Sequence, residues 1–273
     1  MESVEITREG AAAEAASQQR TWASRVEARS PRAMLLHQAG QRSLDVLLSA
    51  LILVVISPVI AVVALAILVE SGGPVLYRAE RVGRDGRVFR MLKFRKMQPS
   101  TGGLPLTTRN DARFTRVGAF LARSKLDELP QFLNVLRGDM SLIGPRPEDP
   151  RFVDWRRSDY DVILQVRPGI TGFAQLAFAD ESQILSEEDP VGHYVDAIFP
   201  QKCALDRLYV HSASVLTDMR VLFWTVVAIA FKRRIAVHRD TGQMGLRRRR
   251  AHTGATGRRA GDGGRERYCR QAA

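Results

Sequence analysis

Cysteine is one of the scarcest residues in this sequence. Among 273 residues only Cys203 and Cys269 are cysteines, and neither forms a CxxC pair or lies in a cluster with histidine. A disulfide framework and a structural zinc site need more cysteines at closer spacing, so the sequence favours neither. We expect two free thiols in a reducing compartment.

Several signatures of common protein classes are missing as well. There is no phosphate-binding loop motif and no GxGxxG after a strand, so neither an NTPase nor a dinucleotide site is indicated. The first residues carry no apolar run, and we therefore expect no cleavable secretory signal. Residues 1–40 are polar and alanine-rich, which predicts a disordered N-terminal tail.

Positive charge is abundant but unevenly distributed. The formal net charge is +12, and the segment from Lys232 to Ala273 holds thirteen lysines and arginines against three acids. With four successive arginines at 247–250 and many glycines, residues 236–273 are predicted to be a disordered basic tail. Such an excess suits anionic partners, namely lipid headgroups, nucleic acid or nucleotide phosphates, without choosing among them.

The strongest physical feature is a run without any charge from Val46 to Val69. It exceeds the roughly 20 residues that a helix needs to cross a bilayer. Ser57-Pro58 lies at its middle, where proline removes a backbone donor and kinks or breaks a helix. The Ser57 hydroxyl can bond a carbonyl that the proline leaves free.

Both flanks of this apolar run are basic. Three arginines precede it, and six cations follow it: Arg29, Arg32, Arg42, Arg78, Arg81, Arg84, Arg87, Arg90 and Lys93. The positive-inside rule prefers both flanks on the cytoplasmic side, which a straight span does not allow. We therefore predict a re-entrant membrane helix over residues 41–72, broken at Ser57-Pro58, with a plain spanning helix as the alternative.

The remaining chain predicts a small, mostly helical α+β domain over residues 73–235. A β-hairpin is expected with its turn at Asp85-Gly86. Helices are expected over 112–137, with a break or new start at Pro130, over 153–166 and over 216–231. Residues 138–150 are expected to be a loop, and residues 167–176 a loop that leads into an extended segment. The last helix suits a membrane surface and a buried core equally well.

Adjacent carboxylates, Asp127 and Glu128, stand out within SKLDELPQ. Paired acids usually belong to a solvated helix face, but here they are accompanied by scattered cations and glycine-rich loops. The accompanying residues are Lys93, Arg95 and Lys96, the Asp111 and Arg113 patch, Arg146 between two prolines, and Arg167 with Gly169 and Gly172 in RPGITG. Together these residue types suit the handling of a diphosphate with a divalent metal.

The order of several motifs resembles the bacterial sugar transferase family, the monotopic phosphoglycosyl transferases. The resemblance runs from about Arg42 to Arg234 and rests on RSLD, SP, KFR-x-M, LDELPQ, GDMSLIGPRP and RPGITG. It implies a re-entrant membrane helix joined to a small α+β domain, with amphipathic helices at the membrane interface. It also implies a place at the bacterial inner membrane, with the catalytic domain on the cytoplasmic face.

The resemblance further implies a two-step reaction with a UDP-sugar and a polyprenyl (undecaprenyl) phosphate. Asp127 would attack the β-phosphorus, release UMP and carry the sugar phosphate until the lipid phosphate accepts it. Glu128 would support Asp127, which would also contact Mg²⁺. A carboxylate is already ionised at neutral pH and needs no base to attack. Such a reaction starts the assembly of exopolysaccharide, capsule or glycoconjugates.

Further residues receive roles through the same resemblance. Four cations would hold phosphate or uridine, and four residues of the RPGITG segment would line the donor pocket: Lys93, Arg95, Arg113 and Arg146, then Arg167, Gly169, Thr171 and Gly172. Each arginine could instead form a structural ion pair. No specific nucleic acid is expected as a partner, and a homodimer is one option for assembly.

The sequence departs from the family pattern at several places. Ala79, Lys96 and Lys125 replace residues that members commonly carry, and FAQLAFADES follows PGITG in place of the commoner AQVNGRN, which leaves the sugar open. We expect a short, catalytic-core form. Two rival interpretations remain: a membrane-anchored nucleic-acid binder led by the basic tail, and an inactive relative that acts as an assembly partner.

Overall fold

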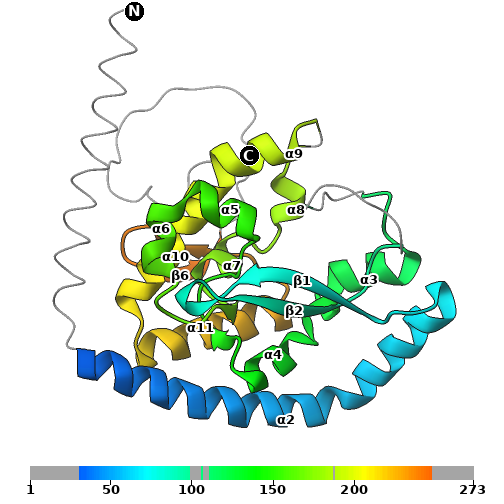
Figure 1. Ribbon diagram of the computed structural model, residues 1–273, viewed down its shortest axis with the longest axis horizontal. Helices are drawn as coiled ribbons and strands as arrows, with labels where there is room; N and C mark the ends of the chain where they lie inside the picture. Colours follow the sequence, from blue (N-terminus) through cyan, green and yellow to red (C-terminus); the bar gives the residue numbers. More distant parts are fainter. Residues whose placement is uncertain (1–30, 99–105, 107–110, 187, 248–273) are drawn as a thin grey trace, which may run out of the picture. The chain divides into compact units, whose positions relative to one another are not determined.

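The computed structural model describes residues 31–98, 106, 111–186 and 188–247, and these are mostly helical with small two-stranded sheets (Figure 1). The α+β, mostly helical class is confirmed. The α-helices are α2 (Pro31–Ser71), α3 (Arg116–Ser124), α4 (Gln131–Arg137), α5 (Pro150–Trp155), α6 (Arg157–Ile163), α7 (Phe173–Ala177), α8 (Glu181–Ile184), α9 (Pro190–His193), α10 (Phe199–Ser212) and α11 (Val215–Ala230). The strands are β1 (Leu76–Val82), β2 (Val88–Phe94), β3 (Ser141–Ile143), β4 (Gly169–Thr171), β5 (Ile235–Val237) and β6 (Met244–Leu246). Single turns of other helix types cover Arg84–Gly86, Leu126–Glu128 and Tyr194–Ile198.

Helix α2 runs without interruption through Pro58 and changes direction in its second half (Figure 1). Proline has no N–H to offer the carbonyl of Val54, four residues earlier. The Ser57 hydroxyl donates to that same carbonyl at 2.8 Å, as the sequence predicted. Because the freed acceptor is satisfied, the helix continues where a break was expected. It also begins at Pro31, so the predicted disorder of residues 1–40 is wrong for residues 31–40.

Most of the apolar side chains of α2 are exposed. Leu47, Val54 and Val69 each expose more than two thirds of their surface. Among the described residues, His37–Ser71 is the one helix long and apolar enough to cross a membrane. A large exposed apolar surface of this kind marks a membrane or protein interaction site.

The inward face of α2 is joined to the rest of the structure by polar and apolar contacts. Asp45 is buried and accepts hydrogen bonds from the Ser141 hydroxyl at 3.1 Å and the Leu142 N–H at 2.9 Å, both in β3. About one helix turn before the end of α2, Ile67 packs in a small core with Phe94 and other apolar residues. A buried carboxylate needs such donors, so Asp45 ties the apolar helix to β3.

Strands β1 and β2 form the predicted hairpin. They pair antiparallel from Leu76 opposite Phe94 to Val82 opposite Val88. Asp85 (φ 57°) and Gly86 (φ 75°) occupy the left-handed region at the turn, which aspartate and glycine tolerate best. The predicted turn at Asp85-Gly86 is confirmed.

The parallel pair of β3 and β4 was not expected, since residues 138–150 were predicted to be a loop. Ser141 lies opposite Gly169, and Ile143 opposite Thr171. A Cβ atom on Gly169 would lie only 2.1 Å from the Gly144 nitrogen, so glycine is required for this backbone approach. The chain after β4 turns into α7, although residues 167–176 were predicted to be a loop that leads into an extended segment.

Two of the predicted helices are divided. The segment 112–137 breaks at Lys125, which has φ 60°, into α3, a short 3₁₀ turn and α4. Pro130 directly precedes α4, so the expected new start there is confirmed. The segment 153–166 is divided at Arg156, where the backbone leaves the helical region between α5 and α6.

The final helix is confirmed close to its predicted bounds, and only Asp218 and Val221 of α11 are buried. The alternative of a buried core helix is therefore wrong. Residues 235–246 form the β5–β6 hairpin with buried Ile235 and Val237, so the predicted disorder of 236–273 is wrong up to residue 246. The rest of both predicted tails, residues 1–30 and 248–273, lies outside the described residues.

The Asp45 contacts lead to a prediction about stability. Asp45→Ala should leave two buried donors of β3 without an acceptor, at a cost of about 1–3 kcal/mol. The melting temperature of the detergent-solubilised protein should fall by about 2–4 °C for each kcal/mol. Asp45→Asn keeps one carbonyl oxygen and should lose less. Equal melting temperatures for Asp45→Ala and the unchanged protein would show that the contact adds no stability.

Candidate functional site

The acidic pair lies on a 3₁₀ turn, Leu126–Glu128, between α3 and α4. Leu126 and Leu129 pack against the small core that includes Ile67 of α2. This anchors the turn from one side. Asp127 is 3% exposed, whereas the Glu128 side chain is 21% exposed. The two adjacent carboxylates therefore have different surroundings.

Two cations from separate elements converge on one oxygen of Glu128. The Lys93 ammonium of β2 lies 3.0 Å from Glu128 Oε1, and the Arg146 guanidinium, from the loop after β3, lies 3.3 Å from the same atom. The sequence predicted both as phosphate-binding residues. The structure brings them together at the acidic pair, across 35 and 18 residues of sequence.

The pKa values of these groups follow from burial and charge. Burial favours the neutral form of Glu128, but Lys93 and Arg146 outweigh it and hold its pKa well below the ordinary value. Burial lowers the pKa of Lys93, and the contact with Glu128 offsets this only in part. Burial also opposes the charged form of Arg146, yet Glu128 and other carboxylates raise its pKa. Glu128 is thus kept ionised.

Asp127 meets a different cation, Lys96, whose ammonium lies 3.5 Å from Asp127 Oδ2. The same ammonium lies 5.6 Å from the centre of the Phe114 ring. The sequence placed Lys96 in the basic cluster MLKFRKM, three residues after Lys93, but as a departure from the family pattern it received no individual role.

Arg95 has hydrogen bonds at the end of α2. Its Nη2 atom donates to the Ser71 carbonyl at 3.1 Å, the Ser71 hydroxyl at 2.7 Å and the Gly72 carbonyl at 2.7 Å. A cation on the last carbonyls of a helix is a favourable C-terminal cap. None of the hydrogen bonds recorded for Arg95 in the described part of the chain reaches the acidic pair.

Arg113 forms a bidentate ion pair with Asp111. Its Nε atom lies 2.8 Å from Asp111 Oδ1, and its Nη2 atom lies 2.6 Å from Oδ2. The bond from Arg113 is the main cause that lowers the pKa of Asp111, and the charge of Lys96 adds to it. The pair is therefore close enough to Lys96 for the charge of Lys96 to lower the pKa of Asp111.

The RPGITG segment supports the Arg146 loop. A Cβ atom on Gly172 would lie 2.3 Å from the Gly144 carbonyl oxygen, and the Thr171 hydroxyl lies 2.8 Å from the Thr225 hydroxyl of α11. Arg167 is half-buried in the loop before β4. Thr171, Gly169 and Gly172 therefore pack against neighbouring segments and support the loop that carries Arg146.

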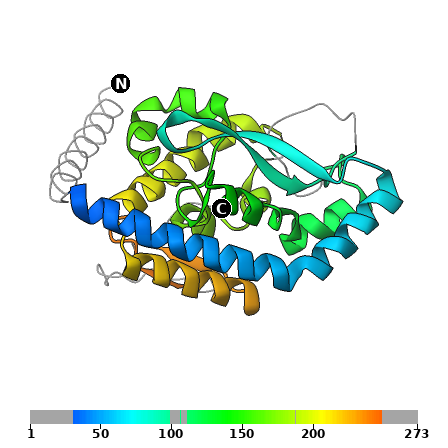
Figure 2. The same ribbon diagram turned by 60° about the horizontal axis from the view of Figure 1, so that its bottom comes forward.

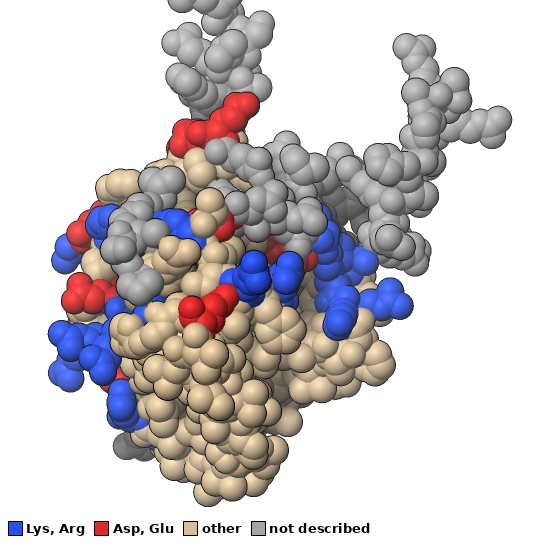
Figure 3. Space-filling view, turned by 90° about the vertical axis from the view of Figure 1, so that its right-hand side faces the viewer, with Lys and Arg blue, Asp and Glu red and all other residues tan. Residues whose placement is uncertain are grey.

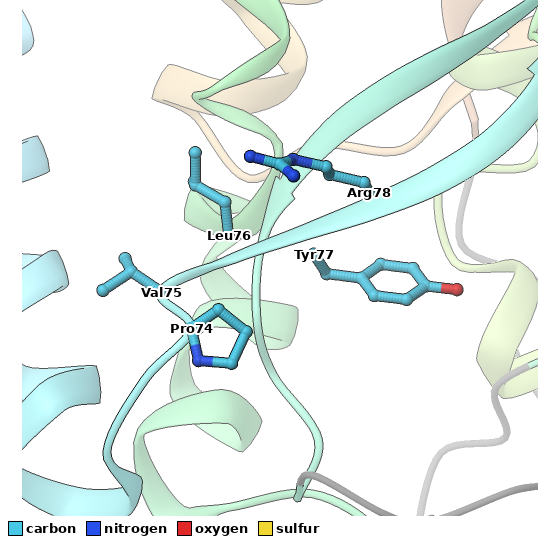
Figure 4. A pocket seen from close by; sticks show the side chains of 5 residues that line it. All are labelled: Pro74, Val75, Leu76, Tyr77 and Arg78. Atoms are coloured by element: carbon cyan, nitrogen blue, oxygen red, sulfur yellow. The ribbon is translucent and has the colours of Figure 1, made fainter.

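A shallow depression lies at the start of β1 and is lined by Pro74, Val75, Leu76, Tyr77 and Arg78 (Figure 4). Tyr77 points to the opposite side of the strand from Leu76 and Arg78 (Figure 4). Because Tyr77 pairs with Lys93 in the hairpin, both side chains occupy one face. An exposed aromatic ring thus stands on the face that carries Lys93.

The residues fit a magnesium ion that is shared with a substrate. Among the described residues there is no group of three or more acidic, histidine or cysteine side chains that could enclose a metal. Mg²⁺ is commonly held by one or two carboxylates together with substrate phosphates. The Asp127 and Glu128 carboxylates supply that donor set.

The charges are segregated on the surface. Figure 3 shows lysine and arginine gathered on the upper and middle parts of one face. The lower part, on the side where α2 lies in Figure 1, consists almost wholly of uncharged residues. α2 and α11 lie along this same side in Figures 1 and 2.

The site is an acidic pair surrounded by lysine and arginine side chains, and the structure also carries a long exposed apolar helix. These features are typical of membrane-associated proteins that bind phosphate groups. The chain belongs to the bacterial sugar transferase family, which it matches over residues 36–232. The family resemblance inferred from the sequence motifs is thereby confirmed.

The chain is similar to several curated proteins whose names refer to undecaprenyl-phosphate transfer or to exopolysaccharide production. A UDP-glucose:undecaprenyl-phosphate glucose-1-phosphate transferase of Escherichia coli (strain K12) is 38% identical over 192 residues, which cover 68% of this chain and 39% of that protein. A protein of the same name from Caulobacter vibrioides is 38% identical, with 69% of each chain covered. The exopolysaccharide production protein PSS of Rhizobium leguminosarum bv. phaseoli is 35% identical, over 69% of this chain and 94% of that protein. The chain therefore spans less than half of the Escherichia coli relative and nearly all of the Rhizobium relative.

The ion pair between Lys93 and Glu128 leads to a prediction about pH dependence. Lys93→Met removes the strongest interaction that lowers the pKa of Glu128, so this pKa should rise. When the solution is acidified, activity that needs ionised Glu128 should then be lost at a higher pH in Lys93→Met than in the unchanged protein. Loss of a charge-assisted bond should also lower kcat/KM by about tenfold to a hundredfold. Profiles of kcat/KM that extend below pH 5, through the ordinary titration range of a glutamate at about 4–5, would measure both effects.

Arg90→Met provides a matched control for this experiment. Arg90 lies on the same strand and its side chain is exposed, so the substitution removes an equal charge away from Glu128. Its pH profile should match that of the unchanged protein. An unshifted profile for Lys93→Met would contradict the assigned role of Lys93.

Proposed function

We propose that this protein transfers a sugar 1-phosphate from a UDP-sugar to polyprenyl phosphate and releases UMP. The observation that carries the proposal is the LDE turn, where Glu128 is held ionised by Lys93 and Arg146 next to Asp127. Cations that already converge on a carboxylate can also bind the oxygens of a diphosphate. The names of the relatives support the same substrates.

The reaction proceeds in two displacements at one phosphorus atom. An oxygen of Asp127 forms a bond to the β-phosphorus of the donor, and the bond from this phosphorus to the bridging oxygen breaks. UMP leaves with that oxygen and its electron pair. A phosphate oxygen of the polyprenyl phosphate then attacks the same phosphorus and displaces the Asp127 carboxylate. The product is a polyprenyl diphosphate sugar, and Asp127 returns to its starting form.

The neighbouring groups have separate roles in this proposal. Glu128 is oriented by Lys93 and Arg146, which also offer their remaining donors to the diphosphate. Lys96 lies beside the attacking carboxylate and can exchange its contact with Asp127 for a phosphate oxygen. These cations offset the repulsion between an anionic nucleophile and an anionic substrate.

A magnesium ion fits the proposed reaction. Asp127, with Glu128 next to it, would hold the ion together with the oxygens of the diphosphate. When bound, Mg²⁺ supplies further positive charge to the transferred phosphate and the leaving UMP.

We further propose that α2 is a re-entrant membrane helix and that the catalytic unit rests on the cytoplasmic face of the inner membrane. Helices α2 and α11, which carry many exposed apolar side chains, lie along one side of the structure (Figure 2), and the part of that side seen in Figure 3 carries few charges. The basic flanks of the apolar run favour a single side for both ends. In this position a lipid phosphate and a soluble nucleotide sugar can reach the same site.

The central test of the proposed function is the substitution Asp127→Asn. Membranes that contain the unchanged protein should release UMP from a UDP-sugar with Mg²⁺ and acquire a sugar-phosphate label on the protein. Asp127→Asn removes the nucleophilic oxygen and should lower UMP release by a factor on the order of 10⁴ or more, with no label. The exposed Asp154, paired only with the exposed Arg157, supplies the control Asp154→Asn, which should retain both signals. Full UMP release by Asp127→Asn would exclude the covalent route, and no release by the unchanged protein would favour an inactive assembly partner.

The proposed topology predicts the same accessibility for both ends of the apolar run. Gly40→Cys and Glu80→Cys, each in a Cys269→Ser background, should react with a membrane-impermeant thiol reagent only from the cytoplasmic side. Cys203 is buried and should remain unlabelled. Labelling of the two positions from opposite sides would show that α2 spans the membrane.

A further inference from the structure

A buried ionic cluster lies behind the loop that carries Arg146. At its centre is Lys202 of α10, which is 3% exposed. The Lys202 ammonium donates to Glu148 Oε1 at 2.6 Å, to Glu181 Oε2 at 3.0 Å and to the Tyr194 hydroxyl at 2.8 Å. The Tyr194 hydroxyl donates in turn to Glu148 Oε1 at 3.0 Å. All three protons of the ammonium therefore have acceptors.

The cluster holds its charges in place although they are buried. Burial opposes the charged form of Lys202, but Glu148 and Glu181 outweigh it and raise the pKa of Lys202. The pKa of Glu148 is lowered, because Lys202 outweighs the effect of burial. Buried ion pairs add little net stability compared with apolar packing. A positional role is thus the better explanation for a lysine at this site.

Lys202 holds the Arg146 loop just beyond Pro147. It binds the side chain of Glu148, two residues after Arg146. Proline restricts the backbone between Arg146 and Glu148. Asp206 lies four residues after Lys202 on the same face of α10, and burial raises its pKa well above the ordinary value, which the charge of Lys202 and the Arg146 backbone offset only in part. The chain that follows Arg146 is therefore held by α10.

The same lysine connects this loop with α8. Glu181 is the first residue of α8, in the segment that departs from the commoner family sequence after RPGITG. Its negative charge acts on Arg146 together with those of Glu128 and Glu148. Lys202 thus joins two segments that approach Arg146 from different parts of the sequence.

We propose that Lys202 is a positioning residue for phosphoryl transfer, which fixes the Arg146 loop and α8 from behind so that the Arg146 guanidinium stays on Glu128 and on the donor diphosphate. This role rests on the proposed function. Lys202 does not touch the substrate and acts through Arg146. Misplacement of a positioning group by about 1 Å can lower the rate on the order of a hundredfold.

Kinetics of UMP release by the full-length protein in membranes test this role. Lys202→Met should lower kcat/KM for the UDP-sugar by about tenfold to a hundredfold. The control is Arg207→Met on the same helix, which breaks the ion pair of Arg207 Nη1 with Asp159 Oδ1 at 2.8 Å, outside the Arg146 loop. Arg207→Met should stay within about twofold of the unchanged protein. Lys202→Arg keeps the charge and should recover part of the loss.

A double-mutant cycle separates positioning from general stability. If Lys202 acts through Arg146, then Lys202→Met should cost less than about twofold when Arg146→Lys is already present. If Lys202→Met does not fold, Tyr194→Phe replaces it in the cycle. It removes one bond to Lys202 while the ring stays stacked on Phe199, and should cost about threefold to tenfold.

The outcomes that would overturn the proposal are distinct. Independent, multiplying losses for the Lys202 and Arg146 substitutions, or an equal loss in Arg207→Met, would reduce Lys202 to a stabilising residue while the proposed function stands. Absence of UMP release from the unchanged protein would instead overturn the proposed function, and the positioning role with it.

Discussion

The convergence of Lys93 and Arg146 on Glu128 Oε1 is the interaction on which the other features of the site depend. Burial opposes the charge of this carboxylate, but the two cations hold its pKa well below the ordinary value. Lys93 lies on β2. The edge of β2 that faces away from β1 is bonded to Asn134 of α4, which accepts from the Leu92 N–H at 2.9 Å and donates to the Arg90 carbonyl at 2.9 Å. Arg146 lies in the loop after β3, and this loop depends on the close approach of Gly144 and Gly169. The two separate two-stranded sheets therefore each place one cation at the same oxygen.

The apolar helix α2 is joined to this site by polar groups at both ends of its uncharged run, Val46 to Val69. Asp45 binds the backbone of β3, and the Glu70 carboxylate accepts from the N–H groups of Arg116 and Val117 at the start of α3. A carboxylate there also offsets the positive end of the α3 dipole. Arg95 caps the last carbonyls of α2. Because each contact would leave a polar group unsatisfied if it broke, α2 cannot rotate or slide without disturbing β3 and α3. An apolar phase that holds α2 would in this way also fix the acidic turn at a set distance from it.

Sequence reasoning succeeded where the physical cause is local. The Asp85-Gly86 turn, the helix start after Pro130 and the Ser57 bond to the Val54 carbonyl each follow from neighbouring residues. It failed where partners are distant or the backbone is unusual. A three-residue strand such as β3 is too short to show a periodic pattern in the sequence. Lys125 adopts the left-handed conformation without being a glycine, so the sequence does not indicate that the helix ends there. The sequence did not single out Lys202, because its partner Glu148 lies 54 residues away. Lys96 was placed in the basic cluster, but its contact with Asp127 depends on the fold and does not follow from the sequence.

The two adjacent carboxylates illustrate how unequal surroundings can divide one task. Glu128 is held by two cations from different elements, so its oxygens are constrained in position. Asp127 meets one cation, Lys96, at 3.5 Å, whereas Glu128 meets two cations at 3.0 and 3.3 Å. A tightly bonded carboxylate is stabilised and thereby made a weaker nucleophile, whereas a loosely paired one keeps more of its reactivity. Pairs of acids whose environments differ in this way commonly take different roles. The asymmetry of the contacts supports the proposal that Asp127 attacks and Glu128 assists.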